Sequence, residues 1–159
     1  MRSMALALLL AAAGCGESYP GESSNVVSVK DSDPAMNKAM EKARATLDQF
    51  TAALQKPGPK QHDFSLKAKF QEGEKAEHMW VNNPTISGDS IKGKLGNDPD
   101  NLKKVRMGMT VTVSRDRVSD WMYVDDGKLV GGYTLRVLRD KMSAKERKEF
   151  DASVPFKIE

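Results

Sequence analysis

The sequence predicts an α+β domain: an N-terminal helix, then five to six short antiparallel strands, then short C-terminal helices. Apolar residues recur with a helical period after Asp33, and the middle of the chain changes to a period of two with β-branched runs. Capping signals return near the C-terminus. Because helices and strands are segregated along the chain, we expect the helices to cover a strongly bent antiparallel sheet or small open barrel.

The first helix is expected from about Pro34 to Gln55. Asp33 suits the N-cap, and Pro34 suits the first helical position, where a missing N–H costs nothing. Pro57-Gly58-Pro59 should end the helix. Its apolar residues form one stripe that we expect to pack on the domain's own sheet: Met36, Met40, Ala43, Leu47, Phe50 and Leu54.

Six runs with strand-like patterning follow, at residues 64–70, 77–81, 90–95, 110–113, 121–124 and 129–130. Asn82-Asn83-Pro84 is expected to end the second strand. Asp125-Asp126-Gly127-Lys128 reads as a hairpin connection between the last two. Residues 133–140 predict a short helix, and Ser143 and Glu146 have capping-box spacing for another.

Residues 1–14 have the features of a secretory signal peptide. Arg2 is followed by an apolar run, 4–13, that is too short to span a bilayer. Ala12-Ala13-Gly14 then precedes Cys15, the single cysteine of the chain, and this ending resembles the lipobox of bacterial lipoproteins. We therefore expect Cys15 to carry palmitate-type lipid and to anchor the mature chain to a membrane. The alternative is an ordinary signal peptide that leaves Cys15 as a spare thiol.

Residues 15–33 are rich in Ser, Gly, Pro and acidic side chains, which is typical of a flexible tether. Gly16 follows the cysteine where an Asp would favour inner-membrane retention, so an outer-membrane location facing the periplasm is favoured in a Gram-negative source. Residues 34–159 then form a single domain. Once Arg2 is removed, 24 basic side chains face 22 acidic ones, and aromatic residues are few. We therefore expect no nucleic-acid partner.

Four segments resemble the YegJ-type family, a bacterial family of unknown function: residues 77–81, 93–99, 118–123 and 131–136. They occur in the family's order, and the resemblance covers roughly residues 35–151. It implies a self-contained bacterial module that sometimes follows an export signal. It implies no established activity.

His78 and Asp120 are the candidate catalytic pair, because a histidine oriented by a carboxylate can act as a general acid or base. Strand alternation places Glu77 on the opposite face from His78, so Glu77 is not the expected partner. The competing interpretation, which we favour, is that Asp120 caps a turn and His78 makes a structural hydrogen bond. A serine nucleophile would need His78 to reach Ser87, Ser90, Ser114 or Ser119, and the sequence selects none of them.

No metal site and no cofactor are expected. His62 and His78 are the only histidines, and Cys15 is assigned to the anchor. Asp98, Asp100 and Asn101 lack the spacing of a calcium loop. No phosphate-binding loop, nucleotide-binding glycine motif or GxSxG elbow occurs.

The candidate binding surface consists of His78, Trp80, Trp121, Tyr123 and Tyr133, since Trp and Tyr are enriched at interface hot spots. Trp80 should share a strand face with His78, and for each tryptophan the favoured interpretation is that it anchors the core. Two functions remain open. The favoured one is a non-catalytic envelope module, antitoxin-like or scaffold, that binds an envelope protein. The alternative is a hydrolase-like enzyme acting on an envelope substrate through His78 and Asp120.

Overall fold

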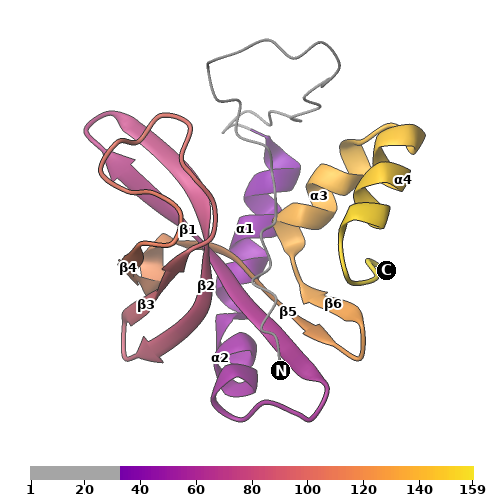
Figure 1. Ribbon diagram of the computed structural model, residues 1–159, viewed down its shortest axis with the longest axis horizontal. Helices are drawn as coiled ribbons and strands as arrows, with labels where there is room; N and C mark the ends of the chain where they lie inside the picture. The colour runs from indigo at the N-terminus through magenta and orange to yellow at the C-terminus, as the bar shows by residue number, and fades with distance from the viewer. Residues whose placement is uncertain (1–32) are drawn as a thin grey trace.

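A computed structural model describes residues 33–159 of the chain, so the expected signal peptide, Cys15 and the tether up to Ser32 lie outside the described residues. The order of elements follows the prediction from sequence (Figure 1). The helices and strands are α1 (Pro34–Ala45), α2 (Leu47–Gln55), β1 (Gln61–Glu72), β2 (Lys75–Ser87), β3 (Ser90–Leu95), β4 (Thr110–Ser114), η1 (Arg115–Arg117), β5 (Val118–Asp125), β6 (Lys128–Gly131), α3 (Tyr133–Lys141) and α4 (Ala144–Ser153).

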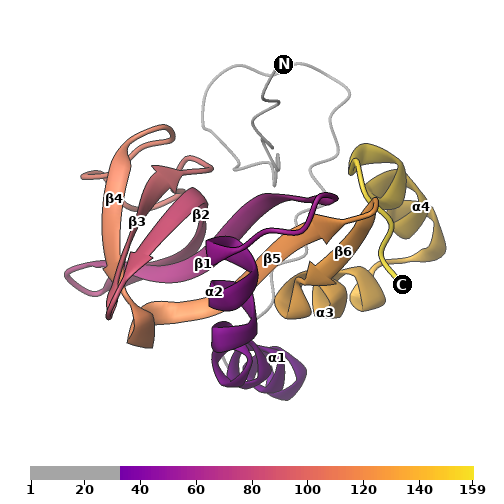
Figure 2. The same cartoon turned by 90° about the horizontal axis from the view of Figure 1, so that it is seen from below.

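The six strands form one antiparallel sheet in the order β4-β3-β2-β1-β5-β6, and the sheet does not close on itself. The prediction of an α+β domain with a strongly bent antiparallel sheet or small open barrel is therefore confirmed, and the sheet is open. In Figure 2 the strands β2, β3 and β4 curl up at one end of the molecule, while α4 lies at the other end. The helices α1 and α2 lie below β5 in that view.

The predicted N-terminal helix is two helices, broken at Thr46. Asp33 does cap α1, because its carboxylate accepts hydrogen bonds from the N–H groups of Ala35 (2.9 Å) and Met36 (3.1 Å). At the break, the indole N–H of Trp121 donates to the Ala43 carbonyl (3.0 Å) and to the Thr46 hydroxyl (3.2 Å). This bond from the sheet to the helix backbone is a tertiary contact, so the helical period of the sequence gave no sign of the break.

The prediction that Asn82-Asn83-Pro84 ends the second strand is wrong, because β2 continues to Ser87. The register with β3 shifts between Asn82 and Thr85, and Asn83 adopts a φ of 50°. Pairing with β1 also ends at Asn82. Pro84 therefore sits at an irregularity where neither neighbouring strand needs its missing N–H.

Two hydrophobic clusters lie on opposite faces of the sheet. On one face, Trp121, Phe50 and Leu66 belong to the larger cluster beneath α1 and α2. On the other, Trp80 and Met122 pack with C-terminal residues that include Leu135 and Phe156. Successive strand residues point to opposite faces. Both faces of the central strands are thus covered, which determines which of the predicted site residues can reach solvent.

A tight turn joins β6 to α3 and sets the position of that helix. Gly131 has a φ of 74°, and a Cβ there would lie 2.3 Å from the main-chain oxygen of Trp121. Gly132, at the helix N-cap, is also left-handed and offers no side chain to cap α3. The first turn of α3 is consequently brought against β5, where another residue supplies the cap.

Candidate functional site

Asp120 supplies that cap. Its carboxylate accepts hydrogen bonds from the N–H groups of Tyr133 (3.0 Å) and Thr134 (2.8 Å), from the Thr134 hydroxyl (2.6 Å) and from the N–H of Trp121 (2.8 Å). The first N–H groups of a helix attract negative charge, so a fully buried carboxylate is stabilised there. Asp120 therefore joins β5 to α3, which matches the structural role that we favoured from the sequence.

Lys67 of β1 lies opposite Asp120 in the register of β1 and β5. Burial raises the pKa of Asp120, and the hydrogen bonds from Thr134 and Trp121 and the charge of Lys67 oppose that shift. Burial likewise lowers the pKa of Lys67, and the Asp120 carboxylate opposes it. The two groups thus compensate each other's charge in a poorly solvated part of the sheet.

His78 is half-buried on β2, and its Nδ1 lies 2.8 Å from the hydroxyl of Ser119. That hydroxyl also donates to the Lys67 carbonyl at 3.3 Å. The structure thereby selects Ser119 from the four serines that the sequence left open. Ser119 is only 1% exposed, however, so its hydroxyl is not presented to a substrate in this conformation. Glu77 points elsewhere and binds the loop N–H groups of Asp100 and Asn101, as strand alternation required.

The sequence prediction that Trp80 belongs to a binding surface is corrected by its burial. Trp80 is 4% exposed and packs in the cluster of Met122 and Leu135, although it does share a face with His78. The Lys67 ammonium lies 5.7 Å from its ring centroid. Its buried Nε1 has no hydrogen-bond partner within the described part of the chain. Trp80 is an anchor of the core because the C-terminal segment covers its face of the sheet.

The other aromatic candidates lie on the opposite face and form one aromatic cluster, in which Trp121 is buried and Tyr123 and Tyr133 are half-buried. Trp121 is 1% exposed, with its ring 6.1 Å from Tyr123 and 5.6 Å from Tyr133. Phe64 stacks on Tyr123 at 4.9 Å, and burial raises the pKa of Tyr123. The predicted five-residue surface is therefore wrong as a single site. Its members are divided between the two faces of the sheet, and both tryptophans are buried.

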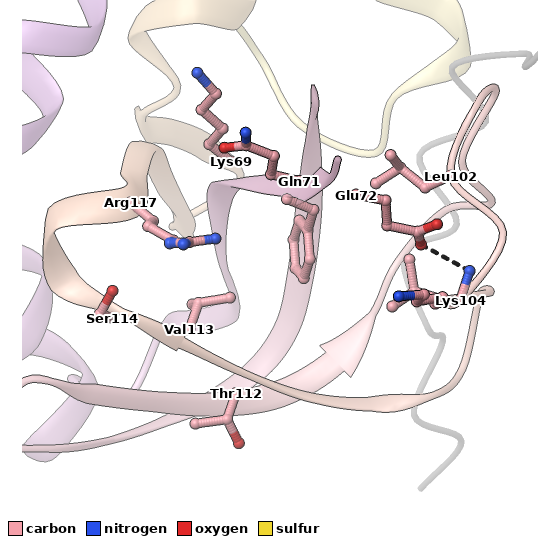
Figure 3. Close-up of a pocket in the computed structure, with 11 residues that line it drawn as sticks. Lys69, Gln71, Glu72, Leu102, Lys104, Thr112, Val113, Ser114 and Arg117 are labelled. Atoms are coloured by element: carbon pink, nitrogen blue, oxygen red, sulfur yellow. Dashed lines mark hydrogen bonds between the residues drawn. The ribbon is translucent and has the colours of Figure 1, made fainter. Parts of the chain in front are cut away.

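An open cleft of about 470 Å³ lies elsewhere, between the C-terminal half of β1 and β4 (Figure 3). Its apolar lining comes from both strands and from the loop between β3 and β4: Phe70, Leu102, Val105 and Val113. Polar residues flank these side chains: Gln71, Thr112 and Ser114. A mixed lining of this kind suits a ligand with both apolar and polar groups.

The cleft has a positive balance of charge. Lys69, Lys104 and Arg117 line it together with one carboxylate, Glu72. Within residues 33–159, Lys69 and Arg117 take part in no ion pair. In Figure 3 the Arg117 guanidinium points toward the middle of the hollow, and Glu72 and Lys104 lie across from it. This surface can therefore attract a negatively charged group.

Glu72 keeps its negative charge, and the three cations of the lining outnumber it. Its carboxylate accepts hydrogen bonds from the main-chain N–H groups of Lys103 (3.0 Å) and Lys104 (2.7 Å). These bonds, the first of them most, lower the pKa of Glu72. The bonds use the backbone of Lys104 and leave its ammonium for another partner. Glu72 thus orders the loop that forms one wall of the cleft.

Sequence reasoning missed this cleft because its cations come from three separate segments. Lys69 is on β1, Lys104 is in the loop before β4, and Arg117 is in η1. Only the pairing of the strands brings them together. Met107 (54%) and Met109 (37%) are exposed apolar side chains beside β4, which suggests a contact surface, but their exposure is visible only in the structure.

Among residues 33–159, no three His, Cys, Asp or Glu side chains are grouped so that they could hold a metal ion. No helix in that range is long and apolar enough to cross a bilayer.

The open sheet, its four helices and the matching segments define a bacterial domain of one family. The chain belongs to the family described as "Uncharacterized protein conserved in bacteria (DUF2314)", whose profile matches residues 33–158. The predicted resemblance to YegJ is confirmed: the chain is 30% identical over 120 residues to the uncharacterized protein YegJ of Escherichia coli K12, covering 76% of this chain and 77% of YegJ.

A second relative is a putative ankyrin repeat protein of Neisseria meningitidis serogroup B. The identity is 36% over 133 residues, which covers 79% of this chain and 53% of the relative. The chain therefore spans about half the length of that protein. No solved structure matches the chain.

Proposed function

We propose that this protein is a non-catalytic protein-binding module, antitoxin-like or scaffold, that Cys15 anchors to the bacterial envelope. The observation that carries the proposal is the cleft between β1 and β4. It combines an open apolar lining with the cations Lys69 and Arg117, which form no ion pair among the described residues. Such a surface suits recognition of a protein segment.

The roles of the candidate catalytic residues also favour binding over catalysis. The Asp120 carboxylate accepts four hydrogen bonds from β5 and α3, so its position is explained by the fold. The alternative hydrolase would depend on His78 and Asp120, and the hydroxyl near His78 belongs to the buried Ser119. A reaction at this pair would require the surrounding core to open.

The name of the Neisseria relative adds support. That protein is named a putative ankyrin repeat protein, and repeats of this class stack into extended binding surfaces. A domain of the present family that shares a chain with such repeats would fit a role in assembling proteins. For this chain, the partner is expected to be an envelope protein.

The test is an affinity pull-down from mildly solubilised native envelopes, with the full lipidated chain as bait. The wild type is compared with the double variant Lys104→Glu/Arg117→Glu and with the control Lys148→Glu. Lys148 is exposed on α4, at the opposite end of the molecule from the cleft. All three proteins are first shown to unfold at similar urea concentrations.

A stoichiometric partner that the wild type and Lys148→Glu retain, and that the double variant loses, would support the binding function. If no such partner is captured, or if the partner is indifferent to the double substitution, the proposed binding surface is wrong. Hydrolysis of envelope material by the wild type but not by His78→Ala would establish the alternative.

A further inference from the structure

The geometry points to a binding mode for this cleft: an extended, acidic segment of the partner adds to the free edge of β4 as a further strand. This inference rests on the proposed binding function. It specifies the conformation and the charge of the partner segment that occupies the cleft.

β4 is an edge strand with hydrogen-bonding groups to offer. It is the last strand in the sheet order, and within the described residues it pairs only with β3. At its two ends, the Met109 carbonyl accepts a hydrogen bond from the Leu95 N–H (2.9 Å), and the Arg115 N–H donates to the Asp89 carbonyl (3.0 Å). In an antiparallel pair, alternate residues of a strand direct their N–H and C=O groups to the same neighbouring strand. The odd-numbered residues of β4 therefore bond to β3, and the even-numbered residues direct their N–H and C=O groups to the free edge: Thr110, Thr112 and Ser114.

That edge has none of the usual protection against pairing. Natural edge strands are commonly blocked by charged side chains, prolines or bulges. β4 reads Thr-Val-Thr-Val-Ser, and its pairing with β3 is regular from Thr110 to Ser114. An uncharged, regular, β-branched edge is the kind of surface that accepts an added strand.

The opposite wall of the cleft has a second unpaired edge. β1 pairs with β5 only from Gln61 to Ala68, although it continues beside β2 to Glu72. The Lys67 carbonyl faces the β5 side, since it accepts the Ser119 hydroxyl. Alternation then directs the backbone groups of Lys69 and Gln71 to the same side. The cleft therefore lies where the curled sheet leaves a gap between two strand edges.

The side chains on the two faces of the cleft differ, which specifies an alternating sequence. Val111 and Val113 point to the buried face of β4, and Phe70 points to the same interior from β1. Thr110, Thr112 and Ser114 take the other face. An added strand would place every second side chain against the apolar interior and the others toward the solvent-facing rim.

The charges at the cleft select an acidic segment. Arg117 and Lys104 face each other across the hollow and Lys69 lies on its rim, whereas Glu72 is held by loop N–H groups. Opposite charges at an interface favour the right partner and repel the wrong one. Alternating acidic and apolar residues therefore fit both the charge and the strand geometry. The exposed Met107 and Met109 offer adaptable apolar contacts beside β4.

The probe is a fluorescein-labelled peptide of about ten residues that alternates glutamate and valine. Its affinity for the full chain, purified in mild detergent, is measured by fluorescence anisotropy. A lysine–valine peptide is the charge control. Two N-methylated glutamate–valine peptides, each blocked on one edge, are the backbone controls. We expect the glutamate–valine peptide to bind at least about tenfold more tightly than the lysine–valine peptide. We expect methylation of the edge that faces β4 to abolish binding.

Protein variants locate the site. Lys104→Glu/Arg117→Glu should weaken glutamate–valine binding by at least about tenfold, while Lys148→Glu should leave it unchanged. Thr112→Pro should abolish binding, because it removes a free-edge N–H without removing a bond to β3. Hydrogen exchange of the wild type should show peptide-dependent protection at Thr110, Thr112 and Ser114. This last measurement keeps the test valid even if Thr112→Pro does not fold.

Binding that tolerates N-methylation on both edges, or that leaves these three amides unprotected, would overturn strand addition. So would failure of the glutamate–valine peptide to bind. If an envelope partner is nevertheless lost in Lys104→Glu/Arg117→Glu, the binding function stands and only the strand-addition mode fails. A dimer of the full chain that Thr112→Pro dissociates would identify a second copy as the occupant and would also overturn the inference.

Discussion

At the scale of single residues, Asp120 illustrates how one side chain can suggest catalysis and serve structure. It is a fully buried carboxylate next in sequence to Ser119, whose hydroxyl contacts His78, and its pKa is raised by burial. Perturbed carboxyls of this kind occur at active sites and in structural networks alike. Here its oxygens cap the N-terminus of α3, whose own N-cap residue is Gly132.

Replacing Asp120 by asparagine should therefore destabilise the fold. The Asp120→Asn side chain keeps one acceptor oxygen but turns an NH₂ group toward donors in α3. We expect the free energy of unfolding to fall by about 1–3 kcal/mol in urea titrations followed by circular dichroism. The matched control is Asp126→Asn, which removes only an exposed ion pair with Lys60 and should cost less than about 1 kcal/mol. Equal midpoints for the two variants would contradict the capping role.

At the scale of elements, specific polar contacts add to the apolar packing that holds the C-terminal helices. Arg139 of α3 binds the Asp151 carboxylate of α4 through two bonds, of 2.6 Å and 2.7 Å. α4 begins with the predicted capping box, in which Ser143 and Glu146 bind each other's main-chain N–H groups. α4 contains no fully buried residue, and these bonds act together with Phe150, which packs partly buried against the cluster of Trp80 and Leu135.

The pair of Arg139 and Asp151 predicts a dependence of stability on pH. Its hydrogen bond from Arg139 holds the pKa of Asp151 below its usual range, which is near about 4 in an unfolded chain. The folded carboxylate therefore stays charged at a lower pH than the unfolded one. The stabilisation is complete above about pH 4 and is lost as the pH falls through the folded pKa.

Urea unfolding of the wild type and Asp151→Asn measures this effect. The difference between their midpoints should be largest near about pH 6 and should shrink as the pH falls below about 4. The control Asp116→Asn changes an exposed carboxylate in η1 that forms no ion pair within residues 33–159. If the difference in urea midpoint between the wild type and Asp151→Asn stays constant down to about pH 2, the ion pair does not cause the dependence of stability on pH.

At the scale of the whole molecule, the two ends of the domain have different roles. One end carries the cleft and the edge of β4, while α3, α4 and the C-terminal segment close the sheet toward the other (Figure 2). The charges of the chain nearly balance, so the positive cleft is a local feature and not the result of a basic composition. An anchor on Cys15 would attach this domain to a membrane through the tether ahead of α1.

Anchoring by Cys15 can be tested on the full chain in its native cells. Cys15→Ser should move the protein from the membrane fraction to the soluble fraction and should abolish incorporation of labelled palmitate, because the lipid supplies the membrane affinity. Ser18→Ala is a small change three positions after Cys15. It should leave the membrane location and the incorporation of labelled palmitate unchanged. Persistence of Cys15→Ser in washed membranes would show that lipid on this cysteine is not the anchor.

Much of the fold could be predicted from the sequence because local signals were strong. Asp33 and Ser143 mark helix starts through their own hydrogen bonds, and the alternation along β1 shows which residues share a face. The break at Thr46 and the continuation of β2 through Pro84 could not be predicted. The break at Thr46 depends on the Trp121 indole, which is distant in sequence. The continuation of β2 depends on the neighbouring strands, because the pairing with β1 ends at Asn82 and the register with β3 shifts after it.

The candidate site shows the same division. The sequence by itself determined the α+β class and the antiparallel sheet, because periodicity and capping act within a few residues of each other. The resemblance of four segments, and not the periodicity, indicated the bacterial family. Only the tertiary structure decided that Trp80 and Trp121 are buried on opposite faces, and that Arg117 and Lys104 meet beside a free strand edge. Burial and juxtaposition depend on which distant segments pack together, and a one-dimensional pattern does not contain that information.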